Sequence, residues 1–252
     1  GERGVSVPDG RFELHQAIVE NQLVLHYQPI VRVSDRTLVA VEALVRWRHP
    51  TRGILPPSQF VPALERAGLA RELTVWVLRE AISQAAVWRA DGQPLAVGVN
   101  VSPENLRDAH FRRYLDMTVR AVGGPEHIIA EIPAATLRSP EQIASLALMR
   151  ERGMRVAIDD VLEPTELSDV PADVLKLGRG LVSRLPVDAR ALEEASVIVR
   201  AAKALGRSVT AVGIEDDLTW RRTVALGCDT AQGFHIAPPL STIDLAAWRA
   251  RR

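Results

Sequence analysis

Six polar side chains lie in, or at the end of, apolar runs that are typical of buried β-strands. They are Glu42, Asn100, Glu131, Asp159, Asp160 and Lys176. Burying such groups is unfavourable unless they pair with one another or bind a ligand. Carboxylate and amide oxygens are the ligands that Mg²⁺ prefers. Two such cations about 3.5–4 Å apart can activate a water and stabilise the leaving oxygen of a phosphodiester. These residues therefore indicate metal-dependent phosphodiester chemistry.

The runs that carry these residues belong to an alternating series of strands and helices. Eight strands are expected, at residues 23–31, 37–47, 95–102, 127–132, 154–160, 173–177, 208–214 and near 228–233. Helical periodicity predicts helices at residues 12–21, 57–68, 71–92, 105–123, 139–153, 191–206 and 217–227, with one more closing the chain. The turn sequence SDRT joins the first two strands, so we expect them to form an antiparallel hairpin.

This order predicts an α/β fold, a TIM-type (β/α)8 barrel with an antiparallel first strand pair. Right-handed crossovers between parallel strands close such a sheet. The barrel is expected to span residues 11–252, after a linker at residues 1–10 that is polar and contains Gly and Pro. An open doubly wound sheet is the alternative, disfavoured by the hairpin and by the lack of a Gly-rich phosphate loop. In a barrel, the C-terminal strand ends carry the site.

Composition limits the function classes. The chain has 252 residues and a formal net charge of zero, so nothing indicates bulk attraction to a nucleic-acid polymer or a membrane surface. Cys228 is the only cysteine, which excludes an intrachain disulfide and favours a reducing, cytoplasmic compartment. No apolar run reaches the ~20 residues of a membrane span. Lysine occurs only at Lys176 and Lys203, which makes Lys176 conspicuous.

Short motifs spread over nearly the whole chain strengthen the chemical interpretation. In chain order they are YQPI (27–30), EAL (42–44) followed by VRW (45–47), NVS (100–102), EI (131–132), DD (159–160), the strand around Lys176, and QGF (232–234). In this order and spacing the chain resembles the EAL domains, a family of cyclic di-GMP phosphodiesterases. The resemblance implies a dinucleotide bound across the C-terminal mouth of the barrel, and its hydrolysis with Mg²⁺ or Mn²⁺.

The resemblance also assigns expected roles. The implied metal ligands are Glu42, Asn100, Glu131 and Asp159. Lys176 and Asp160 take the catalytic positions, with Lys176 orienting the water or offsetting phosphate charge. The implied ligand contacts are Gln28, Leu44, Arg46, Asn100, Asp159, Gln232 and Pro238. Among these, Arg46 is expected to meet a phosphate, because a guanidinium suits that group. Gln28 and Pro238 are expected near guanine.

Four departures from the family pattern concern the same site. Val212 stands where the family has the glutamate that ligates the second cation, and Ala134 where it has a bracing glutamate. Gly178 replaces an aspartate, and the segment from Val161 to Pro171 is shorter and lacks glycines. Losing one preorganised group can reduce a rate by ~10²–10³. We therefore expect at most one well-held cation, with a vestigial role for Asp160 and impaired hydrolysis.

Three functions are compatible with these observations. The leading hypothesis is a degenerate EAL domain that binds cyclic di-GMP as a receptor and signals to an attached sensory or cyclase-like domain upstream. The first alternative is an active Mg²⁺- or Mn²⁺-dependent cyclic di-GMP phosphodiesterase. The second alternative is a protein-interaction module that binds no nucleotide. A homodimer is left open, because the segment after Asp160 that pairs family members is altered.

Overall fold

The computed structural model describes residues 10–122, 127–137, 139–163 and 169–251. Residues 1–9 of the predicted linker lie outside this part, and its last residue, Gly10, already begins helix α1 (Gly10–Val19). The segment from Val161 to Pro171 is also described only in part. Within the described residues, no helix combines the length and the apolar character needed to cross a membrane.

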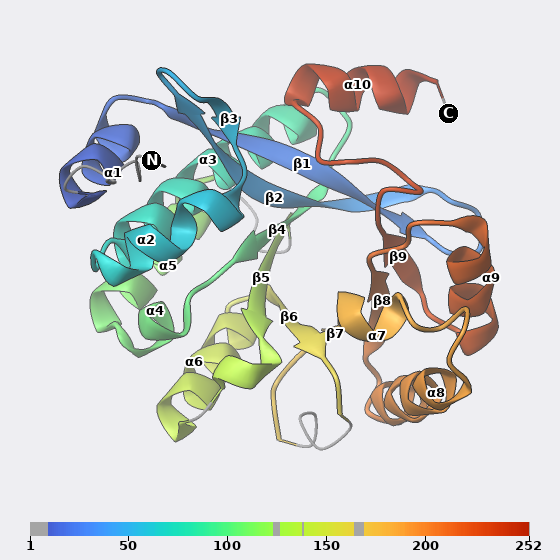
Figure 1. Cartoon of the computed structure of the whole chain (residues 1–252). Coiled ribbons are helices and arrows are strands. Elements are labelled where there is room, and N and C mark those ends of the chain that lie inside the picture. Colours follow the sequence, from blue (N-terminus) through green and yellow to red (C-terminus); the bar gives the residue numbers. More distant parts are fainter. Residues whose placement is uncertain (1–9, 123–126, 138, 164–168, 252) are drawn as a thin grey trace, which may run out of the picture.

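Eight strands form a closed ring, which confirms the predicted barrel (Figure 1). They are β1 (Leu23–Arg32), β2 (Leu38–His49), β4 (Ala96–Asn100), β5 (Ile128–Pro133), β6 (Arg155–Val161), β7 (Val174–Leu177), β8 (Ser208–Val212) and β9 (Thr230–Gln232). Strands β2 and β4 to β9 run parallel around the ring. Strand β1 closes it and is antiparallel to both of its neighbours, β2 and β9.

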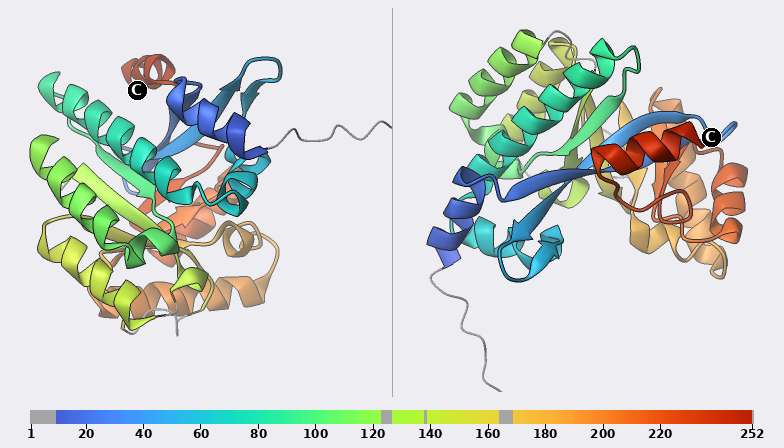
Figure 2. Two further views of the ribbon diagram at one scale, coloured as in Figure 1. Left: turned by 90° about the vertical axis from the view of Figure 1, so that its left-hand side faces the viewer. Right: turned by 90° about the horizontal axis from the view of Figure 1, so that it is seen from above.

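Helices cover the outside of the ring, as both views in Figure 2 show. The long ones are α3 (Ala70–Ala90), α5 (Ala109–Val122), α6 (Pro140–Glu151), α8 (Ala189–Ala204), α9 (Asp217–Leu226) and α10 (Thr242–Ala250). Apolar side chains such as Leu78 and Ile198 are fully buried in the main core. A separate cluster, made of Ile30, Ala40, Ile129, Ala157 and Val174, packs together on five strands. The polar residues of β2, β5, β6 and β7 follow these apolar residues by two positions, and so lie nearer the C-terminal ends of the strands.

Two predicted helices are each broken into two pieces. The helix expected at residues 105–123 is divided into α4 (Pro103–Arg107) and α5, because Asp108 between them has an extended backbone (ψ 113°). The Asp108 carboxylate accepts hydrogen bonds from the His110 amide and from Arg71, which stabilises the break. The helix expected at residues 57–68 is a 3-10 turn, η1 (Pro57–Gln59), followed by α2 (Val61–Arg66).

A ninth strand, β3 (Gly53–Leu55), was not predicted from the sequence. It pairs antiparallel with the end of β2 alone and extends the sheet beyond the ring. One further short helix, α7 (Arg179–Val182), follows β7 directly. One side of the barrel mouth is formed by the C-terminal ends of β6, β7 and β8 together with α7.

Candidate functional site

Lys176 lies at the centre of the barrel mouth, with its side chain only 2 % exposed. Its ammonium Nζ donates to Glu131 Oε2 at 2.5 Å and to Glu42 Oε2 at 3.1 Å, and lies 3.8 Å from Asp159 Oδ1. Three carboxylates from three different strands therefore converge on one positive charge. Pairing of this kind makes the burial of such charges tolerable.

Amide side chains hold Glu42 from two further sides. Asn100 Nδ2 donates to Glu42 Oε1 at 3.0 Å, and Gln232 Nε2 donates to Glu42 Oε2 at 2.8 Å. Gln232 also donates to Gln28 Oε1 at 3.0 Å, and Gln28 in turn donates to the backbone oxygen of Ala237. The chain of bonds thus links β1, β2, β4 and β9 with the loop that carries Pro238.

The pKa values of the two buried glutamates are shifted in opposite directions. Burial raises the pKa of Glu131 to about 8, although the Lys176 ammonium acts against this shift. Burial would also raise the pKa of Glu42, but Lys176 and the hydrogen bonds from Gln232 and Asn100 hold that pKa below its ordinary value. Since an anion is stabilised by each donor it accepts, the number of donors explains the difference. Glu42 is the anion of the pair, and Glu131 is the group that binds a proton near neutral pH.

The third carboxylate, Asp159, is less buried than the glutamates but is affected in the same way as Glu131. Burial raises its pKa, against the attraction of Lys176. The same three carboxylates raise the pKa of Lys176 despite its burial, so the lysine stays charged. The mouth therefore combines a lysine that stays charged with two carboxyl groups, Glu131 and Asp159, whose pKa values are raised.

Gly98 makes room for Glu131. A Cβ atom at Gly98 would lie 2.1 Å from Glu131 Oε1, which is far inside any permitted contact. Gly98 pairs with Glu42 on one side and with Ile129 on the other, so it lies directly between the two glutamate strands. A glycine is required here by close approach of a neighbouring side chain.

Asp160 departs from the regular strand. Its backbone has φ 53°, a left-handed conformation that is uncommon for a residue other than glycine. Its amide donates to Asp159 Oδ1 at 2.9 Å, and a Cβ at Gly178 would lie 2.1 Å from its Oδ1. The Asp160 carboxylate therefore occupies the space above Gly178, where any larger side chain would displace it.

Among the described residues, strands β7 and β8 themselves carry no carboxylate. Val212 ends β8 with an apolar side chain and pairs with Gln232 on β9. Glu215, three residues later, accepts a short hydrogen bond from Arg179. The Arg179 side chain crosses the end of β8, because a Cβ at Gly213 would lie 2.5 Å from Arg179 Cγ.

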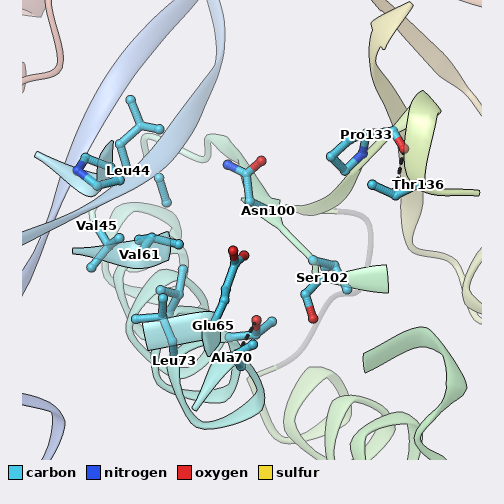
Figure 3. Close-up of a pocket in the computed structure, with 15 residues that line it drawn as sticks. Leu44, Val45, Val61, Glu65, Ala70, Leu73, Asn100, Ser102, Pro133 and Thr136 are labelled. Carbon is cyan, nitrogen blue, oxygen red and sulfur yellow. Dashed lines mark hydrogen bonds between the residues drawn. The ribbon is translucent and has the colours of Figure 1, made fainter. Parts of the chain in front are cut away.

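A pocket of about 370 Å³ opens beside the carboxylates, between the ends of β2, β4 and β5 and the helices α2 and α3 (Figure 3). Leu44, Asn100 and Ser102 line it from the barrel. Figure 3 shows the Glu65 carboxylate pointing into the same space, with Val61 and Leu73 beside it. An apolar pocket with a few polar groups is typical of small-molecule sites.

Arg46 lies on β2 on the same face as Glu42 and Leu44, since side chains alternate along a strand. It is partly buried, and its Nη1 donates to the oxygen of Val45 at 2.9 Å. Burial lowers the pKa of Arg46, and the charge of Glu42 acts in the opposite direction. The guanidinium is thus close enough to the carboxylates to sense them, but among the described side chains it pairs with none of them.

The donor set suits one divalent cation in its chemistry. Glu42, Asn100, Glu131 and Asp159 carry the hard oxygen atoms that Mg²⁺ or Mn²⁺ bind. When all are ionised, the three carboxylates and Lys176 sum to a charge of −2, which one divalent ion balances. In the part of the chain that the structure describes, however, no three His, Cys, Asp or Glu side chains are spaced to hold an ion. Lys176 occupies the point on which the carboxylates converge.

Most of the residues singled out from the sequence are brought together. Gln28, Glu42, Asn100, Glu131, Asp159, Lys176 and Gln232 form one connected network. Leu44 lines the adjacent pocket, and Arg46 lies on the same strand face. Asp160 and Pro238 lie exposed at the rim. Sequence reasoning did not single out Glu65 or Arg179, whose positions depend on tertiary packing.

Comparison with known proteins identifies the family and the fold. The sequence model of the EAL domain matches residues 11–239. The chain is 34 % identical over 249 residues to the cyclic di-GMP phosphodiesterase PA2567 of Pseudomonas aeruginosa, covering 94 % of this chain and 42 % of that protein. It is 32 % identical over 252 residues to the bifunctional diguanylate cyclase/cyclic di-GMP phosphodiesterase MucR of the same organism, covering 93 % and 36 %. The chain thus spans less than half the length of these two relatives.

A solved structure has the same fold. The PaMucR phosphodiesterase in its c-di-GMP complex superposes with a TM-score of 0.88 at 31 % sequence identity, covering 94 % of this chain and 99 % of that one. The likeness therefore extends over the whole barrel, including the strands that carry the polar network.

Proposed function

The chain belongs to the EAL domain family, and from that premise we propose that it is a receptor for cyclic di-GMP with impaired hydrolysis. The family is related to cyclic di-GMP phosphodiesterases. The observation that carries the proposal is the contrast between the two sides of the mouth. The side with Glu42 and Glu131 keeps a connected set of oxygen donors around Lys176, whereas Val212 and Gly178 on the other side add no carboxylate to Asp160.

A ligand with two guanines and two phosphates suits the mouth in its chemistry. The pocket beside Leu44 has apolar walls with Asn100 and Glu65 at its edge, which suits a flat base that also donates hydrogen bonds. Arg46 and Lys176 are the cations on that side of the mouth. We assign the phosphate contact to Arg46, because Lys176 is already enclosed by carboxylates.

The proposal gives the metal a limited role. The carboxylates and Asn100 would hold one Mg²⁺ or Mn²⁺, which would reduce the repulsion between the site and the phosphates. Asp159 and Asp160 are left for a second ion, which these two carboxylates would hold less tightly than three would. Since electrostatic preorganisation is commonly the largest part of a rate enhancement, losing the second ion is expected to make hydrolysis very slow.

The wider assignments belong to the same proposal. A cytoplasmic location suits a receptor for an intracellular dinucleotide. An attached sensory or cyclase-like domain is supported by the length of the curated relatives, of which the chain covers 42 % and 36 %. Pairing into a homodimer has no support among the contacts described here and is not part of the proposal.

Calorimetric titration with cyclic di-GMP in excess Mg²⁺ tests the proposal. We expect saturable heat from the parent protein without sustained heat flow. Arg46→Ala should weaken the affinity about 10- to 150-fold, because a hydrogen bond to a charged group is worth about 1.5–3 kcal/mol. Arg48→Ala is the matched control: Arg48 lies two residues along the same strand, is exposed and bonds the backbone of Asn21. Its affinity should equal that of the parent.

Two results would overturn the assignment. Linear product formed with Mn²⁺, and abolished by Glu42→Ala, would establish the active phosphodiesterase instead. The absence of binding heat at several temperatures would favour an interaction module that binds no nucleotide.

A further inference from the structure

Arg179 is an exposed cation on the side of the mouth where Val212 and Gly178 supply no carboxylate. Its side chain is 68 % exposed, and that of its partner Glu215 is 53 % exposed. Among the described residues Glu215 is its one ion-pair partner, so most of the five N–H donors of the guanidinium face solvent. An exposed ion pair of this kind contributes little stability, and it can exchange for a better anion.

The path of the Arg179 side chain depends on Gly213. Arg179 directly follows Gly178, above which the carboxylate of Asp160 lies. Its aliphatic part crosses Gly213, at the end of β8, where no larger residue would leave room. The guanidinium is therefore directed along the rim from β7 to β8, next to Val212, and not outward along α7.

The charges along this rim oppose a second metal ion. Three acidic residues follow β8, and each already has a partner: Glu215 is bound by Arg179, Asp216 accepts from the Thr219 amide, and Asp217 pairs with Arg221. Gly178 and Val212 supply no oxygen from their side chains. Strands β7 and β8 thus add no carboxylate to Asp159 and Asp160 for a cation bound there, and the same rim carries the guanidinium of Arg179.

We propose that Arg179 takes over the electrostatic role of a second cation by binding a phosphate of the anionic ligand directly. A guanidinium forms paired hydrogen bonds with phosphate oxygens and carries its charge at every accessible pH. Glu215 keeps the side chain oriented along the rim in the absence of ligand. This inference rests on the proposed function, because it concerns a second contact to the same dinucleotide.

The consequence is binding that does not require metal. Because Arg179 is part of the chain, the dinucleotide should bind the parent protein in excess EDTA. We expect Arg179→Gln to weaken this metal-free affinity about tenfold and Arg179→Lys to weaken it less, since the charge is kept and the planar fork is lost.

The control is Arg184→Gln. Arg184 lies one turn further along the chain, is 47 % exposed, and is paired with Asp188 and Glu194 away from the rim. Its variant should bind as the parent does. Calorimetric titration of cyclic di-GMP in EDTA and in Mg²⁺, with all four proteins, gives the full comparison.

The outcomes separate the two proposals. Parent protein that binds in EDTA, with Arg179→Gln equal to it, would overturn the role of Arg179 and leave the receptor function standing. Binding by the parent only in the presence of Mg²⁺ would also overturn it. No binding by the parent under either condition would overturn the receptor function, and this inference with it.

Discussion

At the residue scale, the charge of Lys176 stabilises three neighbouring carboxylates. Without its charge, Glu42, Glu131 and Asp159 would repel across a mouth that is largely closed to water. Removing one partner of a buried ionic group usually costs about 3–5 kcal/mol, since the others are left uncompensated. The same arrangement makes Glu131 the proton-binding member, because it accepts fewer donors than Glu42.

The raised pKa of Glu131 predicts a pH-dependent stability. A carboxyl whose folded pKa of about 8 exceeds its ordinary 4.5 binds its proton more tightly in the folded protein than in the unfolded chain. Its stabilising contribution is therefore complete below about pH 4.5 and is lost as the pH rises through about 8. Relative to Glu131→Gln, the metal-free parent should lose on the order of a few kcal/mol between about pH 5 and about pH 9.

Urea denaturation at several pH values in EDTA measures this difference. Glu104→Gln, an exposed substitution on α4, serves as the control and should follow the parent at every pH. A constant difference between Glu131→Gln and the parent across the range would contradict the assignment. Excess Mg²⁺ should reduce the pH dependence, because an ion bound at Glu131 replaces its proton.

At the element scale, the register between β2, β4 and β5 places the two glutamates on either side of a glycine. Glu42 pairs with Gly98, and Asn100 pairs with Glu131. A shift by one residue in either pair would turn these side chains to the other face of the sheet. The site is therefore a property of strand pairing as much as of residue identity.

Gly98→Ala tests this dependence. The added methyl would overlap the Glu131 carboxylate, whose residue is 1 % exposed and cannot move into solvent. We expect a loss of about 1–3 kcal/mol in the free energy of unfolding, together with weaker ligand binding. Gly180→Ala, where nothing lies within 4 Å of the new atom, should change stability by no more than about 0.5 kcal/mol. Equal effects of the two substitutions would show that the close approach at Gly98 is unimportant.

Strand order and the polar strand residues were predictable, because alternating apolar runs show the strands and buried charges are conspicuous within them. The helix break at Asp108 was not predictable. The Asp108 carboxylate that stabilises it accepts a hydrogen bond from Arg71, which is distant in sequence. Strand β3 is three residues long and shows no alternation. The direction of Arg179 depends on the absence of a side chain at Gly213, which becomes visible only when β7 and β8 are paired.

For the whole molecule, the ring brings three carboxylates together around Lys176 on one side of the mouth, whereas the strand ends on the other side add none to this cluster. Asn100 and the acids of β2, β5 and β6 lie around Lys176, whereas β8 ends in Val212 and β9 in Gln232. Strand pairing is continuous through both sides of the ring. The asymmetry therefore lies in the side chains and not in the backbone fold.

The asymmetry predicts the number of ions that the protein holds. Equilibrium dialysis with Mn²⁺ should give at most one tightly bound ion per chain. Val212→Glu returns a carboxylate to the end of β8 and should raise this number toward two, because a further oxygen donor then reaches the Asp159 side. Val209→Glu would be no control, because that residue is fully buried in the core. Leu218→Glu on the exposed face of α9 should leave the number unchanged. Two tight ions on the parent chain would contradict the prediction.

The polar network also joins parts of the chain that are far apart in sequence. Lys176 meets Glu42 across 134 positions, and Gln232 meets Gln28 across 204. Contacts of such separation form only when distant strands of the ring come together, and we expect this closure to follow the folding transition state. Interactions that are absent from the folding transition state mainly slow unfolding. An ion or nucleotide bound at the mouth should therefore prolong the lifetime of the closed barrel while hardly changing how fast the chain folds.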